Sequence, residues 1–303
     1  MSYHDLSSVT IRVPGSSANL GPGFDCMGIA WNIYNEVTFT LTEKPGLVVT
    51  GCENQYANEY NLANVAFVEV IKQSGRKFGR RGLRIEFGET QIPVSRGLGS
   101  SAALIDAGVL AANELLELDM SESELFAIAT NLEGHPDNIA PAMFGGLTAG
   151  VMDNGKAIYA HYDVTDKLHF AVMIPSFELS TQLARTVLPK AVILQDAIFN
   201  LSRTALLIRA LETGDPELLR VALKDQLHQQ YRAHLINDYF AMKHIAEQAG
   251  CIGFCISGAG PTLLAFSADA MVSERIKNAL AWQNVWKVLP VKIAGGAEII
   301  KNF

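Results

Sequence analysis

Residues 93–118 read PVSRGLGSSAALIDAGVLAANELLEL, a glycine-rich turn followed by an alanine-rich apolar segment. The apolar segment predicts a long, mostly buried helix over residues 100–118, with the turn at its N-terminus. Glycines let a backbone turn tightly and approach an anion closely, and the free amides and dipole of a helix N-terminus attract that anion. A tight turn with a serine N-cap would explain the glycines, but three serines and Arg96 around one turn favour a phosphate-binding loop.

Two other nucleotide-binding motifs share part of this pattern, and the flanking residues argue against both. GLGSSA at residues 97–102 matches the G-x-G-x-x-A of a dinucleotide-binding unit. Such a unit needs a second strand that ends in an acidic residue about 20 residues on. Here Glu117 lies at the helix end and a further helix follows. A Walker A loop needs Lys-Ser or Lys-Thr after its last glycine, and neither stands here.

A second polar cluster, EGHPDN at residues 133–138, stands at a predicted helix end and combines two carboxylates, an imidazole and a carboxamide. Glu133 is suited to hold a divalent metal, because Mg²⁺ in phosphoryl-transfer sites takes few protein oxygens and fills its remaining positions with phosphate and water. The alternative is a loop in which Asp137 or Asn138 caps the next helix. His135 alone reads equally well as a structural histidine or a ligand.

Two further turns are rich in glycine. ANLGPGFD at residues 18–25 exposes Asn19 and Asp25, and its alternative reading is a connecting loop with an Asx turn. SGAGPT at residues 257–262 lies between predicted strands and carries no charged group. It reads equally well as a tight turn or a functional loop.

The segments around these motifs predict an α+β protein. Apolar alternation predicts strands over residues 8–13, 36–42 and 83–87. Helical spacing over residues 61–74 ends at Gly75, and a capping box of Ser121 with Glu124 starts a helix over residues 122–132. After a hairpin-turn signal at residues 153–155, the pattern restarts with a strand at 168–174, a helical region over 195–244 and β-rich segments to the end. We therefore expect two lobes, residues 1–155 and 156–303.

Length and composition agree with a globular protein of two lobes. The 303 residues exceed the length at which single cores usually stop growing, and 49% hydrophobic with 18% charged residues excludes a disordered or collagen-like chain. A net charge of −7 provides no overall positive field for nucleic acid. No signal peptide or membrane-spanning stretch is evident, so we expect a cytoplasmic protein that does not bind membranes. The four scattered cysteines predict free, mostly buried thiols.

The four motifs together resemble those of the homoserine kinases, a family of the GHMP kinase superfamily. ANLGPGFD, PVSRGLGSSAA, EGHPDN followed by IAPAMFGG, and SGAGPT occur in the family's order, within residues 12–267. GLGSSAA is specific only to the superfamily, whereas ANLGPGFD and EGHPDNIAPA are more specific to homoserine kinases. The lead-in PGSS at residues 14–17 departs from the Pro-Ala-Ser-Thr type that is more common in the family.

The resemblance implies a fold, a reaction and a set of nucleotide-site residues. The fold would be a two-lobed GHMP kinase fold, with an N-terminal ribosomal-protein-S5-like lobe and a C-terminal α/β sandwich lobe. The reaction would use ATP and Mg²⁺ to phosphorylate the side-chain hydroxyl of L-homoserine, giving O-phospho-L-homoserine for threonine biosynthesis. Asn61 would lie near the adenine, Glu133 with Ser100 or Ser101 would bind Mg²⁺, and the ATP phosphates would be wrapped by Pro93, Val94, Ser95, Arg96, Gly97, Leu98, Gly99, Ser100, Ser101, Ala102 and Ala103.

For the amino-acid substrate, the resemblance points to Asn19, Asp25, His135, Asn138, Thr181, Arg185 and Arg232. A carboxylate suits the guanidinium forks of Arg185 and Arg232, and an ammonium suits Asp25 as acceptor. Asn138 aligns with an aspartate that some GHMP kinases carry for deprotonation, and an amide cannot serve as a base. With Asn138, Glu133 and Ser101 as the catalytic residues, we therefore expect catalysis by positioning and charge stabilisation.

Two rival interpretations remain at this point. One is another small-molecule GHMP kinase, of the mevalonate or shikimate type, which would need no ammonium acceptor. The other is a catalytically inactive GHMP-fold amino-acid sensor, against which intact Glu133, Ser100 and Ser101 argue. The oligomeric state is open, with a homodimer as one candidate.

Overall fold

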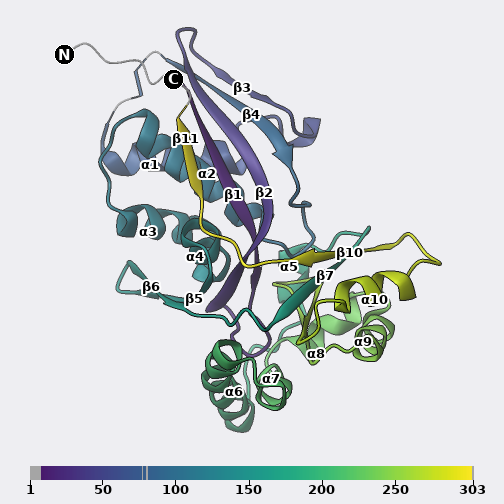
Figure 1. The fold of residues 1–303 in the computed structure, drawn as a ribbon. Coiled ribbons are helices and arrows are strands. Elements are labelled where there is room, and N and C mark those ends of the chain that lie inside the picture. The colour runs from purple at the N-terminus through teal and green to yellow at the C-terminus, as the bar shows by residue number, and fades with distance from the viewer. Residues whose placement is uncertain (1–7, 77, 80, 302–303) are drawn as a thin grey trace.

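The structure is a computed structural model that describes residues 8–76, 78–79 and 81–301. Its strands form two sheets (Figure 1), and together with the helices they make an α+β protein, as expected. The larger sheet has seven strands in the core order β11-β1-β2-β4-β3, with β5 paired to β2 and β6 paired to β5. These strands are β1 (Ser8–Ala18), β2 (Met27–Thr42), β3 (Leu47–Thr50), β4 (Gly82–Thr90), β5 (Leu147–Asp153), β6 (Lys156–Tyr162) and β11 (Glu298–Lys301).

A layer of helices covers one face of this sheet, as Figure 1 shows. They are α1 (Leu62–Ser74), α2 (Ser100–Leu115), α3 (Glu122–Glu133) and α4 (Pro136–Phe144). Asn61 caps α1 and Gly75 ends it in the left-handed conformation, while the predicted capping box of Ser121 and Glu124 starts α3. The helix α2 is buried along most of its length, as its alanine-rich sequence predicts, and ends at Leu115, three residues before the expected end.

The smaller sheet has the order β10-β7-β9-β8. Its strands are β7 (His169–Pro175), β8 (Gly253–Ile256), β9 (Leu263–Ser267) and β10 (Trp286–Val291). The helices of this half are α5 (Thr181–Thr186), α6 (Leu194–Thr213), α7 (Pro216–Ala222), α8 (Gln229–Arg232), α9 (Tyr239–Gln248) and α10 (Val272–Ala279). Among the described residues, every helix is too short or too polar to span a lipid bilayer.

The larger sheet extends past the expected lobe boundary at residue 155. The turn at residues 153–155 closes a hairpin, as predicted, and its second strand β6 stays in the same sheet as β5. The last strand, β11, also returns to this sheet and pairs antiparallel with β1. The N-terminal lobe is therefore completed by segments from beyond residue 155.

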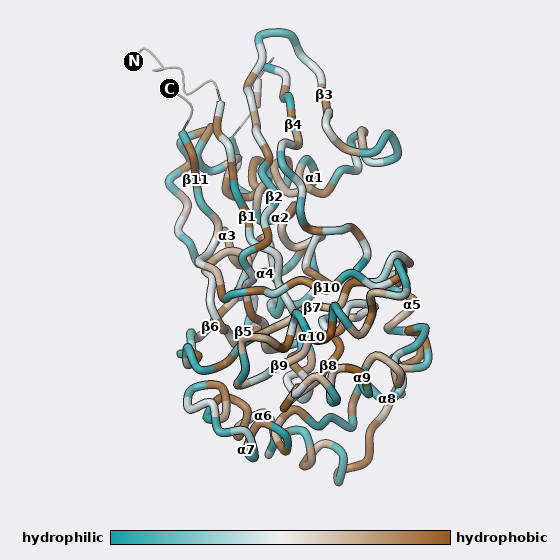
Figure 2. The backbone as a smooth tube through the Cα atoms, turned by 45° about the vertical axis from the view of Figure 1, so that its right-hand side comes forward, coloured by the Kyte–Doolittle hydropathy of each residue, from teal (hydrophilic) through white to brown (hydrophobic). Residues whose placement is uncertain are grey.

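The strand β3 was not foreseen, and its position explains why. It is four residues long and lies at the sheet edge, where β4 is its one partner among the described strands, so it lacks the long apolar alternation of a central strand. Figure 2 shows hydrophilic colour on the loop that follows β3, at the same end of the sheet. This loop includes the short 3-10 helix Asn54–Tyr56 and forms one wall of the cavity described below.

Candidate active site

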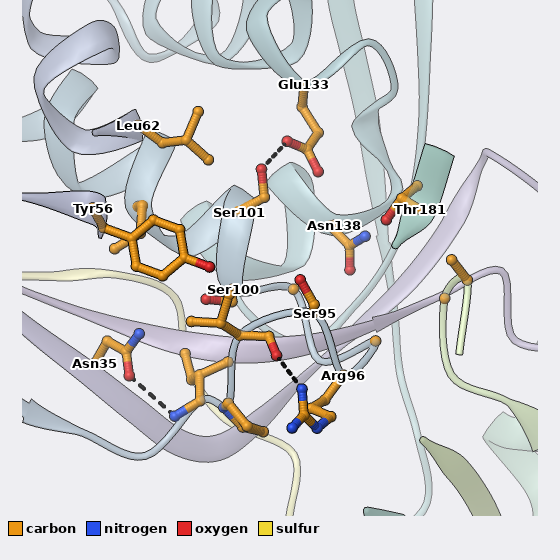
Figure 3. Close-up of a pocket in the computed structure, with 18 of the residues that line it drawn as sticks. Asn35, Tyr56, Leu62, Ser95, Arg96, Ser100, Ser101, Glu133, Asn138 and Thr181 are labelled. Carbon is orange, nitrogen blue, oxygen red and sulfur yellow. Dashed lines mark hydrogen bonds between the residues drawn. The ribbon is translucent and has the colours of Figure 1, made fainter. Parts of the chain in front are cut away.

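One cavity of about 940 Å³ receives residues from all four motifs. The phosphate-loop stretch, the EGHPDN segment, the ANLGPGFD turn and Gly258 of SGAGPT line it together with α5 and Arg232. Figure 3 shows Ser100, Ser101, Glu133, Asn138 and Thr181 around one open space. Segments more than 200 residues apart in the chain therefore converge on a single site.

The glycine loop has the geometry that an anion-binding turn needs. Gly97 and Gly99 have φ values of +77° and +71°, in the left-handed region. A Cβ at Gly97 would lie 2.5 Å from the Ser257 carbonyl oxygen, and one at Gly99 would lie 2.2 Å from Ser16 Oγ. Gly99 occupies the N-cap of α2 without a side-chain cap, so the first amides of this buried 16-residue helix remain for a ligand.

The loop residues divide between the cavity and the core. Pro93, Val94, Ser95, Arg96, Gly97, Gly99, Ser100 and Ser101 line the cavity. Leu98, Ala102 and Ala103 belong instead to the hydrophobic core, with at most 1% of each residue exposed. Because their side chains face away from the cavity, only the backbone of these three residues is available to a phosphate.

Arg96 lines the cavity, and its guanidinium is also held by other parts of the protein. Its guanidinium donates to the carbonyl oxygens of Pro175, Ser176 and Val94, and pairs with Glu178 at 3.1 Å. Since Pro175 ends β7 and Ser176 follows it, Arg96 connects the loop to the end of a strand of the smaller sheet. Long-range packing, which sequence spacing does not reveal, supplies all of these partners except Val94.

Ser101 and Glu133 form a direct contact within the cavity. Ser101 Oγ donates to Glu133 Oε2 at 2.6 Å, as Figure 3 shows. Glu133 ends α3, and the left-handed Gly134 behind it turns the chain into the next helix. Burial raises the pKa of the Glu133 carboxyl, although the hydrogen bond from Ser101 opposes that rise. The site therefore holds a desolvated carboxylate beside a hydroxyl, which is a donor set suited to a hard cation.

His135 and Asp137 form a second polar pair at the start of α4. His135 is the N-cap of α4, and its Nδ1 contacts Asp137, whose side chain is almost fully buried. Burial lowers the pKa of His135, but the bond to Asp137 and the charges of Asp25 and Glu133 outweigh that effect and raise it. Ligand-capable atoms of Asp25, His135 and Asp137 lie within 4.8 Å of one another. Asp137 is already hydrogen-bonded to His135, and Asp25 to Arg185, so both carboxylates of this group are engaged by other side chains.

Three asparagines predicted for the site hold its loops in place. Asn19 donates to the Gly258 carbonyl at 2.8 Å and accepts from the Asp25 amide at 2.9 Å. Asn138 accepts from Ser16 Oγ at 2.9 Å, directly beside the N-terminus of α2. Asn61 caps α1 by accepting from Ala63 N, and donates to the Tyr56 carbonyl at 2.9 Å. All three still line the cavity, so each combines a structural contact with a position next to the ligand space.

Asp25 and Arg185 were expected to bind opposite ends of a substrate, and the structure pairs them with each other. Arg185 Nη1 and Nη2 donate to the two oxygens of Asp25 at 3.0 and 2.7 Å. The hydrogen bond to Asp25 raises the pKa of Arg185. Thr181 lies one helical turn before Arg185 on α5, and both line the cavity. The pair is partly exposed, so a ligand in the cavity can reach both charges.

Arg232 is the buried cation of the site. Only 1% of the residue is exposed, and its guanidinium donates to the Ala184 and Gly258 carbonyls at 3.2 Å each. Burial and the charge of Arg185 lower its pKa to about 10. The Phe24 ring lies 5.2 Å from this guanidinium and 5.8 Å from that of Arg185. Two arginines thus approach one aromatic ring at the cavity wall, which is an arrangement suited to an anionic group.

Sequence reasoning missed three residues that shape this site. Ser16 lies in a strand and gives no local signal, although it orients Asn138. Phe24 lies inside ANLGPGFD, but only the polar residues of that motif, Asn19 and Asp25, were considered as candidates for the site. His228 precedes Arg232 by four residues, a spacing that brings two side chains together on a helical turn. That spacing was the one available signal for His228.

The comparisons with known proteins agree on the family. The GHMP kinases N terminal domain matches residues 61–146, and the GHMP kinases C terminal domain matches residues 207–284. A homoserine kinase from Clostridium botulinum (strain Kyoto / Type A2) is 44% identical over 297 residues, which cover 97% of this chain and 99% of that protein. A homoserine kinase from Clostridium beijerinckii (strain ATCC 51743 / NCIMB 8052) is 40% identical over 298 residues, with the same coverage.

A solved structure supports the same assignment. The crystal structure of homoserine kinase from Cytophaga hutchinsonii ATCC 33406 superimposes with a TM-score of 0.86 and 27% sequence identity, covering 99% of this chain and 100% of that one. The expected two-lobed GHMP kinase fold is thereby confirmed. The chain belongs to the homoserine kinase family of the GHMP kinases.

Proposed function

We propose that this protein transfers the γ-phosphoryl group of ATP to the side-chain hydroxyl of L-homoserine, giving O-phospho-L-homoserine for threonine biosynthesis in the cytoplasm. The observation that carries the proposal is the convergence of a glycine loop, a Ser101–Glu133 pair and a cluster of two arginines with one aspartate on one cavity. An anion site, a cation site and a zwitterion site are what this reaction needs side by side.

The phosphates of ATP would lie against the loop at residues 93–99 and the N-terminus of α2. Gly97 and Gly99 leave room for the close approach of a phosphate, and the free amides of the first turn donate to its oxygens. These donors are fixed by the core packing of α2, so they need little reorganisation as negative charge shifts toward the leaving group. Asn61, with the 3-10 helix beside it, would border the adenine.

The Ser101–Glu133 pair fits a Mg²⁺ ion. Burial raises the pKa of Glu133, because it destabilises the charged carboxylate in the free site. A divalent cation would stabilise that charge. When bound there, Mg²⁺ would neutralise charge on the transferring phosphoryl group. Ser101 would keep the Glu133 carboxylate oriented through their hydrogen bond, and Ser100, which lines the same wall, is the alternative hydroxyl.

Homoserine would lie between the Asp25–Arg185 pair and Arg232. Its ammonium would take the place of Arg185 at Asp25, and its carboxylate would be shared by Arg185 and the buried Arg232. Without substrate, the Asp25–Arg185 ion pair keeps both charged groups oriented. With homoserine bound, Asp25 would pair with the ammonium and Arg185 with the carboxylate. His135, Asn138, Asn19 and Thr181 would border the side chain that carries the hydroxyl.

Catalysis would depend on positioning more than on proton removal. Asn138 lies beside the α2 N-terminus and accepts from Ser16 Oγ, so its amide can orient the hydroxyl without taking its proton. A loose phosphoryl-transfer transition state needs little prior deprotonation of the acceptor. The fixed amides, the helix dipole and the metal-binding pair would therefore supply most of the acceleration.

The test is ADP formation from ATP and Mg²⁺, measured with homoserine, mevalonate, shikimate or no acceptor, together with detection of phosphohomoserine. Turnover that depends on homoserine supports the proposal. Turnover with mevalonate or shikimate alone would support a different small-molecule kinase. Homoserine binding with no ADP formation under any condition would support an inactive sensor.

A further inference from the structure

His228 is a fully buried histidine outside the cavity lining, and it joins two parts of the site. Its Nε2 lies 2.7 Å from the Gly21 carbonyl oxygen, within the ANLGPGFD loop that carries Asp25. Its Nδ1 lies 3.3 Å from Nη1 of Arg232. The Phe24 ring stacks on the imidazole at a centroid distance of 5.1 Å. The ring therefore connects the loop that follows β1 to the buried guanidinium.

These two contacts allow a single protonation state of the ring. A carbonyl oxygen can only accept, so Nε2 must carry the hydrogen that is donated to Gly21. A guanidinium can only donate, so Nδ1 must offer its lone pair to Arg232. The neutral Nε2–H tautomer satisfies both contacts at once. Protonation at Nδ1 would remove the acceptor and set a second positive charge against Arg232.

The charged groups around the ring balance in favour of this neutral form. Burial lowers the pKa of His228, and the charge of Arg232 lowers it further. Asp225, whose Oδ2 lies 3.7 Å from Nε2, and the more distant Asp25 act in the opposite direction. Asp225 is itself engaged by the backbone amides of residues 227–229 and by Asn200.

Arg232 thereby has three neutral acceptors: two carbonyl oxygens and one imidazole nitrogen. These partners fix the direction of the guanidinium without cancelling its charge. A carboxylate in place of the imidazole would orient Arg232 equally well, but it would neutralise the charge that a substrate carboxylate needs. The chemistry of the residue at 228 thus bears directly on how strongly the cavity attracts an anion.

We propose that His228 is a positioning residue, which aims Arg232 at the substrate carboxylate as a neutral acceptor and ties that arginine to the loop bearing Asp25. The inference rests on the proposed function in taking homoserine as the ligand. It adds a determinant of substrate affinity that lies behind the cavity wall and does not touch the substrate.

The test compares His228→Asn with His228→Asp, because the two side chains have the same shape and differ by one charge. Both retain an acceptor near the position of Nδ1, and both lose the donor to Gly21. We expect the dissociation constant for homoserine, measured by calorimetry, to be at least about tenfold higher for the Asp variant than for the Asn variant. The dissociation constant for MgATP should be the same in both. Equal homoserine affinities in the two variants would overturn the proposal.

A third variant covers the case in which the Asp variant does not fold. His228→Gln places an amide nitrogen near the position of Nε2, so it keeps the donor to Gly21 and removes the acceptor for Arg232. Homoserine should bind at least about tenfold more weakly to the Gln variant than to the Asn variant. The reverse order would mean that the loop contact alone matters, and would overturn the role assigned to Arg232.

The pH profile separates this role from a purely structural one. As the pH falls through the lowered pKa of His228, the wild-type affinity for homoserine should weaken, and the Asn variant should lose that part of the dependence. His135 also titrates in the site but is present in both proteins, so the difference between them isolates His228. Identical profiles would contradict the proposal. Turnover of the wild type tests the proposed function separately. If the protein binds homoserine but transfers no phosphate, the kinase activity is refuted, and the binding measurements still test the role of His228.

Discussion

Arg185 offers the sharpest test of substrate recognition, through the substitution Arg185→Leu. In the free protein its guanidinium is bound bidentately by Asp25, and the two side chains are 38% and 34% exposed. Exposed ion pairs contribute about 0.2–1 kcal/mol, whereas truncating one partner of a buried charge pair costs about 2–5 kcal/mol. For this half-buried position we expect a loss of about 1–3 kcal/mol in transition-state binding, or roughly 5- to 150-fold in kcat/KM for homoserine.

The assay uses two substrates, homoserine and its amide, on the wild type and the variant. The amide lacks the carboxylate charge, so it should be a poor substrate for the wild type and lose less than about threefold on substitution. Arg220→Leu is the matched control, since Arg220 also pairs with a carboxylate, Glu217, and lies outside the cavity lining. Its kinetics should match the wild type. Equal fold-losses for homoserine and the amide in Arg185→Leu would refute the assignment of Arg185 to the carboxylate.

Three further outcomes test the proposed metal-binding pair, a buried carboxyl group and the glycine loop. Ser101→Ala and Glu133→Gln should each lower kcat by about 10²-fold or more while calorimetry shows an unchanged affinity for homoserine, and a selective loss of homoserine binding would exclude the metal role. Asp106 is fully buried, neither of its carboxylate oxygens has a hydrogen-bond partner, and burial raises its pKa. The stability of the wild type should therefore fall as the pH rises above the pKa that Asp106 has in the unfolded chain. Asp106→Asn should raise the free energy of unfolding by about 1–3 kcal/mol at neutral pH, and this gain should shrink toward pH 4. A gain that does not depend on pH would contradict this explanation. Gly99→Ala would place a Cβ 2.2 Å from Ser16 Oγ at a positive φ, so its melting temperature and MgATP affinity should both fall, and wild-type values for both would show that the loop is not constrained as described.

Local features of the fold were predictable because their causes lie within a few residues. The capping box of Ser121 and Glu124, the asparagine cap and glycine end of α1, and the hairpin turn at residues 153–155 each depend on hydrogen bonds between near neighbours. The glycine loop ahead of α2 was predictable for the same reason, since a turn and the amides of the following helix belong to one continuous segment. The motif order also sufficed to recognise the family.

The partners of the charged residues were decided by the tertiary structure. Asp25 and Arg185 are 160 residues apart and meet only because α5 lies against the loop after β1. Arg96 is held by carbonyls at the end of β7, and β11 returns to pair with β1 across almost the whole chain. A single sequence carries the charge of each residue but not the packing of the two sheets that decides which charge it meets. The motifs and the family resemblance therefore pointed to most residues that border the cavity, although Leu98, Ala102 and Ala103 face the core, and only the folded chain assigned the contacts.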